Sequence, residues 1–379
     1  MKKLFFTSLL FAICYITEAQ LDSIHFVPPM HARVDWGPQY LLLTTSETTP
    51  FSVNIKDGTG NIIQSVNISN TTPFKYHIGD SDDTFTFVLE NDLHTALQRK
   101  GLIIEGKKKF YAYIRIHSEN KNQASDLTCK ASSALGKIFR IGHLLQNTGS
   151  SLSNFVGILA TEDSTNIKLS DFDSNTKFRK NGNDIASTGI ESFLLNRGES
   201  LVIAQYLNSN STNQPPNGLM GALLESSKPI AVSTGSWCGS PVSTGDKDAG
   251  IDQIAPLEKV GKEYILNKGN GNTTLERPII IAHFDNTMIY LNGAPTPSVT
   301  LNAGEYYAVP TSFYTTQNNL HIKSSEAIFV YQMIGGISSG TNAYRTEGLI
   351  FVPPISCNIP SSIDNIFEPF IQVDNESNR

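Results

Sequence analysis

The sequence lacks most of the features by which enzymes and membrane proteins are recognised. It contains no P-loop and no G-x-G-x-x-G motif after a strand, so no nucleotide-binding turn is indicated. None of its eight histidines forms a His-x-His or His-x-x-x-His pair, and we expect no metal and no other cofactor. Beyond the N-terminus, no apolar run reaches the roughly 18 residues that a transmembrane helix needs.

Charge is also scarce. Charged residues make up 17% of the chain and the formal net charge is -6. A nucleic-acid partner is not expected, because proteins that bind the phosphate backbone usually carry a basic face. With 39% hydrophobic residues the chain is apolar enough to fold. Its 379 residues are many for one compact core and suggest two or three modules.

The N-terminus predicts export. Met1, Lys2 and Lys3 precede a nearly unbroken apolar stretch over residues 4–16, and Ala19 stands at a cleavage position. We interpret residues 1–19 as a signal peptide, since the apolar run is too short for a stable anchor. A lipoprotein signal at Cys14 is less favoured, because the bulky Ile13 precedes it.

Three of the four cysteines remain after this cleavage: Cys129, Cys238 and Cys357. An odd number cannot all pair within one chain. Their wide spacing excludes a compact zinc knuckle. One long-range disulfide with a free thiol and three free thiols both remain open.

Alternating apolar and polar residues recur along the chain, as in Phe51–Ile55 and Phe110–Ile116. This alternation predicts strands with one buried face, because successive side chains on a strand point to opposite faces. Asn-Gly and Asp-Gly turns separate the runs. The only helical candidate is short, at residues 91–99. The sequence therefore predicts an all-β fold.

The strands belong to a degenerate repeat. Four landmarks recur in the same order: G-K-x-[FY] at 136–139 and 261–264, D-x-T-x-I-x-L at 163–169 and 285–291, L-N-x-G-E at 195–199 and 301–305, and S-x-x-I-x-V at 227–232 and 325–330. A weaker copy precedes them, with Gly37–Tyr40 as its expected opener. Phe351–Pro354 repeats Phe26–Pro29.

The copies predict tandem β-modules at residues 20–118, 119–250 and 251–348. Residues 349–379 would begin a fourth unit or form a C-terminal cap. Each copy suits a sandwich-like unit or a pair of propeller blades, and the modules could close around an axis. The sequence leaves these arrangements open.

The most repeated positions are expected to shape the fold rather than to bind: Asp163, Asp285, Gly198, Gly304, Glu199, Glu305, Gly136 and Gly261. The aspartates would start an Asx turn with the backbone two residues on. The glycines of L-N-x-G-E would take a positive φ. The glutamates after them would bind a turn amide or face water.

Recognition is expected in the loop at 236–250, which is polar, follows an apolar strand and contains one of only two tryptophans. Loops on a rigid scaffold often carry binding residues, and tryptophan is enriched in hot spots. The candidate contacts are Trp237, Ser240, Asp246, Asp248 and Asp252. Trp237 could equally fill the core. The acidic stretch at 80–83 resembles half a calcium loop but lacks its glycine and distal glutamate, which favours a solvated turn.

The stretch from Ser227 to Gly235, then Cys238, Asp252–Pro256 and Gly261–Tyr264, resembles the N-terminal domain family of IgGFc-binding proteins. One departure is that Asp248 and Asp252 stand near the position of the family's usual histidine. The resemblance implies a β-rich extracellular binding module, of a kind that Bacteroidetes secrete or display on the cell surface. It does not establish immunoglobulin binding.

We therefore expect a non-catalytic adhesion or binding module, secreted or on the cell surface, for a protein or glycan. One alternative is a secreted carbohydrate-active enzyme whose two carboxylates converge from different modules. Another is a structural stalk. The ligand, the oligomeric state and the completeness of the chain remain open.

Overall fold

The computed structural model describes residues 20–32, 36–118, 124–146, 152–207, 214–239, 248–269, 276–334 and 348–356. The predicted signal peptide, Ser240, Asp246 and Cys357 lie outside these ranges. Within them the fold is all-β, as predicted, and the helices are short 3₁₀ turns. The predicted helix at 91–99 is wrong, because only η1 (Glu90–Asp92) is helical there.

The described strands form three seven-stranded sheets. The first contains β1 (Asp22–Val27), β3 (Trp36–Thr44), β4 (Phe51–Asp57), β5 (Ile62–Ile68), β6 (Phe74–Gly79), β8 (Leu102–Ser118) and β9 (Ala124–Thr128). The second contains β10 (Gly136–Arg140), β11 (Leu152–Ala160), β12 (Thr165–Ser170), β15 (Glu191–Leu195), β16 (Ser200–Leu207), β17 (Leu223–Gly239) and β18 (Asp248–Ile254). The third contains β19 (Gly261–Asn267), β20 (Pro278–Ala282), β21 (Thr287–Leu291), β22 (Val299–Leu301), β23 (Tyr306–Ala308), β24 (Asn319–Ile334) and β25 (Gly348–Phe351).

Smaller elements decorate these sheets. They are the parallel pair β2 (Met30–His31) and β7 (Phe87–Val88), the hairpin β13 (Lys177–Lys180) and β14 (Asn183–Ala186), and the 3₁₀ turns η2 (Ala131–Ala134), η3 (Leu257–Lys259) and η4 (Thr311–Phe313).

All three sheets share one topology. The strand orders are β5-β4-β8-β3-β6, β15-β12-β17-β11-β16 and β22-β21-β24-β20-β23. The central strands β8, β17 and β24 are 17, 17 and 16 residues long. The first half of β8 pairs with β1 and β4, and its second half with β3 and β9. Each long strand therefore belongs to two half-sheets, which encloses a sandwich-like core.

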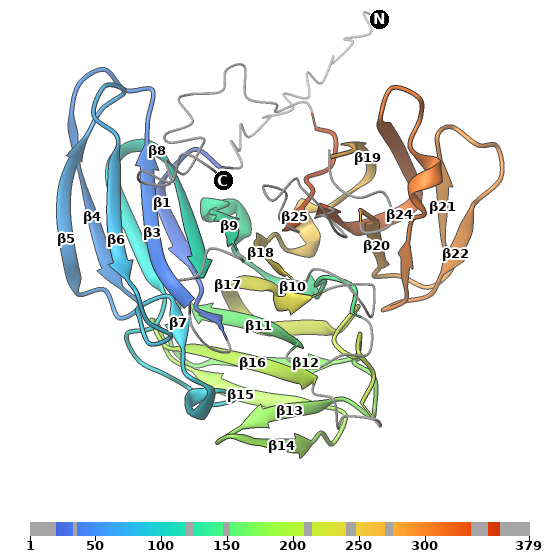
Figure 1. Ribbon diagram of the computed structural model, residues 1–379, viewed down its shortest axis with the longest axis horizontal. Coiled ribbons are helices and arrows are strands. Elements are labelled where there is room, and N and C mark those ends of the chain that lie inside the picture. The colour runs from blue at the N-terminus through green and yellow to red at the C-terminus, as the bar shows by residue number, and fades with distance from the viewer. Residues whose placement is uncertain are drawn as a thin grey trace, which may run out of the picture.

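The sheets are arranged around a common centre (Figure 1). The first sheet (blue to cyan) and the third (orange) stand on opposite sides of the second (green to yellow). The last strand of each sheet, β9, β18 or β25, lies toward the centre of the molecule. Strands β17 and β18 are buried on both faces from Ile230 onward, because other sheets cover them.

The strand pairing places the module boundaries later than 118, 250 and 348. Strand β9 pairs with β8, and β18 with β17, so each completes the sheet before it. Strand β25 likewise pairs with β24, and Ile355 N donates to Glu263 O at 2.9 Å. Residues 348–356 therefore continue the third sheet, and the rest of the predicted fourth unit or C-terminal cap, residues 357–379, lies outside the described residues.

The expected opener Gly37–Tyr40 is also corrected. Gly136 and Gly261 begin the first strands of their sheets, whereas Gly37 lies in β3, which corresponds to β11 and β20. A Cβ on Gly136 would lie 2.2 Å from the Pro256 Cβ. The proline that follows the last strand therefore packs on the start of the first strand.

The landmarks D-x-T and L-N-x-G-E lie side by side, since β11 pairs with β16 and β12 with β15. Asp163 Oδ1 accepts from Arg197 N at 3.0 Å, and Glu199 Oε2 accepts from Asn196 N at 2.7 Å. The third sheet repeats both bonds, from Ala303 N to Asp285 Oδ1 at 3.0 Å and from Asn302 N to Glu305 Oε2 at 2.7 Å. The predicted Asx turns are therefore wrong, because the aspartates bind the neighbouring turn.

The L-N-x-G-E turns also dock successive sheets. Gly198 and Gly304 take the predicted positive φ, at 78° and 81°. A Cβ on Gly198 would lie 2.2 Å from Gly58 O of the first sheet. At the next junction, a Cβ on Gly221 of the second sheet would lie 1.9 Å from Gly304 O of the third. Both junctions therefore bring two glycine backbones into direct contact.

Replacing Gly198 by alanine tests this contact against backbone strain alone. We expect Gly198→Ala to lower the free energy of unfolding by about 2–4 kcal/mol, since strain and overlap add. Gly60→Ala is the matched control, because Gly60 has a φ of 93° and open space at its Cβ; its cost should stay near 1 kcal/mol. Urea unfolding measures both, and equal costs would contradict the docking role.

Two buried histidines have side-chain pKa values below the usual value for histidine. Burial lowers the pKa of His25 and of His143 to about 4 in each case. His25 Nε2 lies 2.8 Å from Phe110 O, and His143 Nδ1 lies 2.7 Å from Leu144 O. Both rings are therefore held neutral in the folded chain at neutral pH.

This predicts acid sensitivity. Between pH 6.5 and 4 the unfolded chain takes up a proton at each histidine that the folded chain refuses, so stability falls as the pH falls. Each histidine should contribute a loss of about 3 kcal/mol from pH 7 to 4. His25→Gln should flatten the curve of unfolding free energy against pH by about 1.4 kcal/mol per pH unit in that window; an unchanged slope would count against it.

Candidate functional site

The centre of the molecule is held by Asp252 of β18, which is 3% exposed. Its Oδ1 lies 2.8 Å from Lys130 Nζ and accepts from Thr128 N at 3.3 Å, both at the end of the first sheet. Its Oδ2 accepts from Phe351 N of β25 at 2.8 Å. One carboxylate therefore joins all three sheets.

Neighbouring side chains of β18 bind the first sheet in the same way. Asp248 Oδ1 accepts from Ala124 N at 3.1 Å, and Gln253 Oε1 accepts from Lys130 N at 2.5 Å. These bonds satisfy backbone amides at the start of β9 and just beyond its end. The side chains of β18 thus take the place of a further strand.

Burial raises the pKa of the Asp252 carboxyl above its usual value, and the Lys130 ammonium and the amides counteract part of that rise. Burial likewise raises the pKa of the adjacent Cys129 thiol to about 12. Cys129 and Cys238 are both buried free thiols. The disulfide alternative for this pair is therefore wrong here.

Removing the charge of Asp252 should be costly. In Asp252→Asn the Lys130 ammonium stays buried without a counter-charge, so we expect about 3–5 kcal/mol of lost stability. Asp126→Asn is the control, because Asp126 pairs with Arg115 at 3.0 Å while its side chain is 58% exposed; its effect should stay below about 1 kcal/mol. Chemical denaturation at pH 7 compares the two, and similar losses would contradict the central role of Asp252.

A cavity of about 290 Å³ opens beside Asp252, between the first and third sheets. Its lining comes from β8, β9, β18, β24 and β25: Arg115, Ile116, Ala124, Ser125, Asp126, Thr128, Asp252, Ile334, Gly348, Leu349 and Ile350. Ile350 is 43% exposed at its rim. We call this space the axial cavity.

An aromatic and basic surface adjoins the axial cavity on the outer side of the first sheet. We call it the tyrosine face, and it comprises Tyr40, Lys75, His77, Tyr113, Arg115 and His117. The alternate residues Leu41, Ile114 and Ile116 point into the core and are buried. The members of the tyrosine face are partly or fully exposed.

The side chains of the tyrosine face contact one another across three strands. Lys75 Nζ lies 4.6 Å from the centre of the Tyr40 ring, and the Arg115 guanidinium carbon lies 5.8 Å from that of Tyr113. The rings of Tyr40 and His77 are 5.3 Å apart. The Phe110–Ile116 alternation already placed Tyr113 and Arg115 on one face, and this was the signal that could have located the surface.

The predicted contact residues that the structure describes lie elsewhere. Trp237 is 4% exposed and packs in the core cluster of the first sheet, which corrects its assignment as a ligand contact. Asp248 and Asp252 are buried against backbone amides. Of these three, only Asp252 reaches the axial cavity. Ser240 and Asp246 lie outside the described residues.

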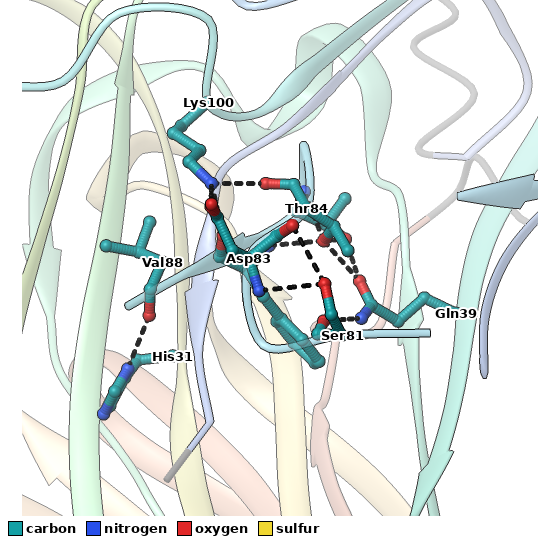
Figure 2. A network of polar contacts seen from close by, with 9 residues as sticks. His31, Gln39, Ser81, Asp83, Thr84, Val88 and Lys100 are labelled. Atoms are coloured by element: carbon teal, nitrogen blue, oxygen red, sulfur yellow. Dashed lines mark hydrogen bonds and ion pairs between the residues drawn. The ribbon is translucent and has the colours of Figure 1, made fainter. Parts of the chain in front are cut away.

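The acidic stretch at 80–83 is held by an ion pair and hydrogen bonds from neighbouring segments (Figure 2). The Lys100 ammonium bonds the Asp83 carboxylate and also donates to Thr84 O at 2.6 Å. Gln39 Nε2 donates to Ser81 O at 2.8 Å. The Lys100 ammonium thus already pairs with the Asp83 carboxylate. The described residues contain no cluster of three acidic, histidine or cysteine side chains suited to a metal ion.

Comparison with known proteins gives one match. A family model described as IgGFc binding protein matches residues 124–370, which is more than half of the chain. The match begins at β9 and runs through the second and third sheets. No curated protein matches the chain. Among the described residues, no helix has the length and apolar character needed to cross a membrane.

Proposed function

The chain belongs to the IgGFc binding protein family, and on this premise we propose that it is a secreted or cell-surface module that binds an extracellular protein or glycan without catalysis. The ligand would lie on the tyrosine face and over the axial cavity.

The observation that carries this proposal is the position of Tyr113. The strand register makes Tyr113, Ser233 and Tyr331 equivalent. The first residues of β1, β10 and β19 pair with Phe110, Ile230 and Ile328 of the long central strands, and each of the three equivalent residues lies three positions further along its strand. Ser233 Oγ donates to Pro29 O at 2.9 Å, and Tyr331 Oη donates to Arg140 O at 2.6 Å. In the second and third sheets this position therefore binds a backbone carbonyl in, or directly after, a strand of the preceding sheet.

The first sheet has no preceding sheet among the described residues. Its equivalent surface carries Tyr113, Arg115 and His117, whereas Ser233 and Tyr331 are fully buried. A surface built like a docking face but partly exposed to solvent suits an external ligand. Tyrosine and arginine are also the residues most enriched in binding hot spots.

The enzyme alternative receives one supporting feature, because Asp126 and Asp252 from different sheets line one cavity. The bonding of Asp252 argues against it. A glycosidase carboxyl must reach the substrate as acid, base or nucleophile, whereas both oxygens of Asp252 accept from lysine or backbone amides of three sheets. We therefore favour binding over catalysis.

Arrays of extracellular proteins and glycans, probed with residues 20–379, test this function. We expect the double variant Tyr113→Ala, Arg115→Ala to weaken binding to any captured ligand at least tenfold, as loss of two anchors should. Tyr290→Ala on β21 is the matched control and should bind like the wild type.

Two outcomes would contradict the proposal. One is unchanged binding by the double variant while its circular dichroism spectrum is retained. The other is sustained cleavage of a polysaccharide by the purified chain, which would restore the enzyme alternative.

A further inference from the structure

The axial cavity lies where a third junction between sheets would be. The first and second sheets meet at one junction, and the second and third meet at another. The cavity is bounded by Ile116 of the first sheet and by Ile334, Leu349 and Ile350 of the third, with Asp252 beside them. It therefore separates the two sheets that are not consecutive.

Aromatic side chains of the chain itself fill the two occupied junctions. At the first, Trp237 of β17 packs into a cluster that contains Leu127 and Cys129 of the first sheet. At the second, Tyr331 and Phe351 of the third sheet join the core cluster of the second, with their rings 5.2 Å apart. Each aromatic residue comes from the sheet that follows in sequence. No later sheet is described that could supply one to the third junction.

The chemistry of the lining favours a flat apolar group. Isoleucine and leucine form much of the wall, and the carboxylate of Asp252 is already engaged by Lys130 and by amides. Arg115 is bonded to Asp126. A sugar ring requires several hydrogen-bonding groups from its site, and both oxygens of Asp252 and the Nε of Arg115 are already bonded within the protein. A volume of about 290 Å³ lies at the lower end of ligand pockets and suits one ring system.

We propose that the axial cavity binds a single aromatic side chain, tryptophan or tyrosine, presented by a partner protein. This inference rests on the proposed function and narrows its ligand from a protein or glycan to a protein. The chain flanking the inserted ring would cross the tyrosine face, whose Arg115 lines the cavity. Aromatic anchors in desolvated pockets commonly dominate the energy of protein interfaces.

Saturation-transfer NMR with three small probes tests the cavity directly. N-acetyl-tryptophanamide should bind the wild-type chain with a Kd of about 1 mM or tighter, which a probe of this size can reach. N-acetyl-leucinamide should bind at least about fivefold more weakly. N-acetylglucosamine should not bind. Equal binding of the sugar, or no binding of the tryptophan probe, would overturn the proposal.

Filling the cavity provides a matched pair of variants. Ile350→Trp places an indole at the rim and should abolish binding of N-acetyl-tryptophanamide. Ile355→Trp is the control, because Ile355 is 48% exposed on the same segment but does not line the cavity. In the wild-type chain the methyl resonances of Ile116 and Ile350 should shift with the tryptophan probe. Retained binding in Ile350→Trp, or unmoved methyl resonances, would count against the cavity.

These results separate the two proposals. If the chain captures a protein or glycan on the arrays but the tryptophan probe does not bind, the proposed function stands and this inference fails. If the probe binds in the cavity but no ligand is captured, the proposed function fails, and only the affinity of the cavity for an aromatic ring is retained.

Discussion

The arrangement of the three sheets depends on one buried carboxylate, that of Asp252. A buried charge is tolerated only when it is paired and its lone pairs are bonded. Here the partners come from the end of β9, from β18 itself and from β25. A shift of one sheet relative to the others would therefore leave either the charge or a backbone amide unsatisfied. The hydrophobic contacts between sheets supply attraction, and this carboxylate restricts the geometry.

The same docking contact occurs between the first and second sheets and again between the second and third sheets. The turns at Gly198 and Gly304 place two successive sheets against their predecessors, and Ser233 and Tyr331 donate to carbonyls across those junctions. The first sheet carries the equivalent surface, and no preceding sheet occurs among the described residues. The proposed ligand surface and the axial cavity both lie on the side of the first sheet where the described residues do not repeat this contact. Function in a repeat protein is thus expected where the repeat contact is missing.

The candidate contacts in the 236–250 loop illustrate what sequence patterns miss. Trp237, Asp248 and Asp252 follow an apolar strand in a polar stretch, which is typical of an exposed loop. The strands β17 and β18 extend further than expected and lie between other sheets, so polar residues there bind amides rather than water. Alternation shows that a strand has two faces but not what covers the second face.

The sequence by itself determined the all-β class, the order of the repeated strands and the positive φ of Gly198 and Gly304, because these follow from local periodicity and turn chemistry. It also located the bond of Glu199 within its own turn as one of two options. Only the tertiary structure decided that Asp163 binds the neighbouring turn, that Tyr331 is buried and that Tyr113 is partly exposed. Tyr113 and Tyr331 occupy equivalent positions in equivalent strands, and they differ because the second sheet packs against Tyr331, whereas no sheet precedes that of Tyr113 among the described residues.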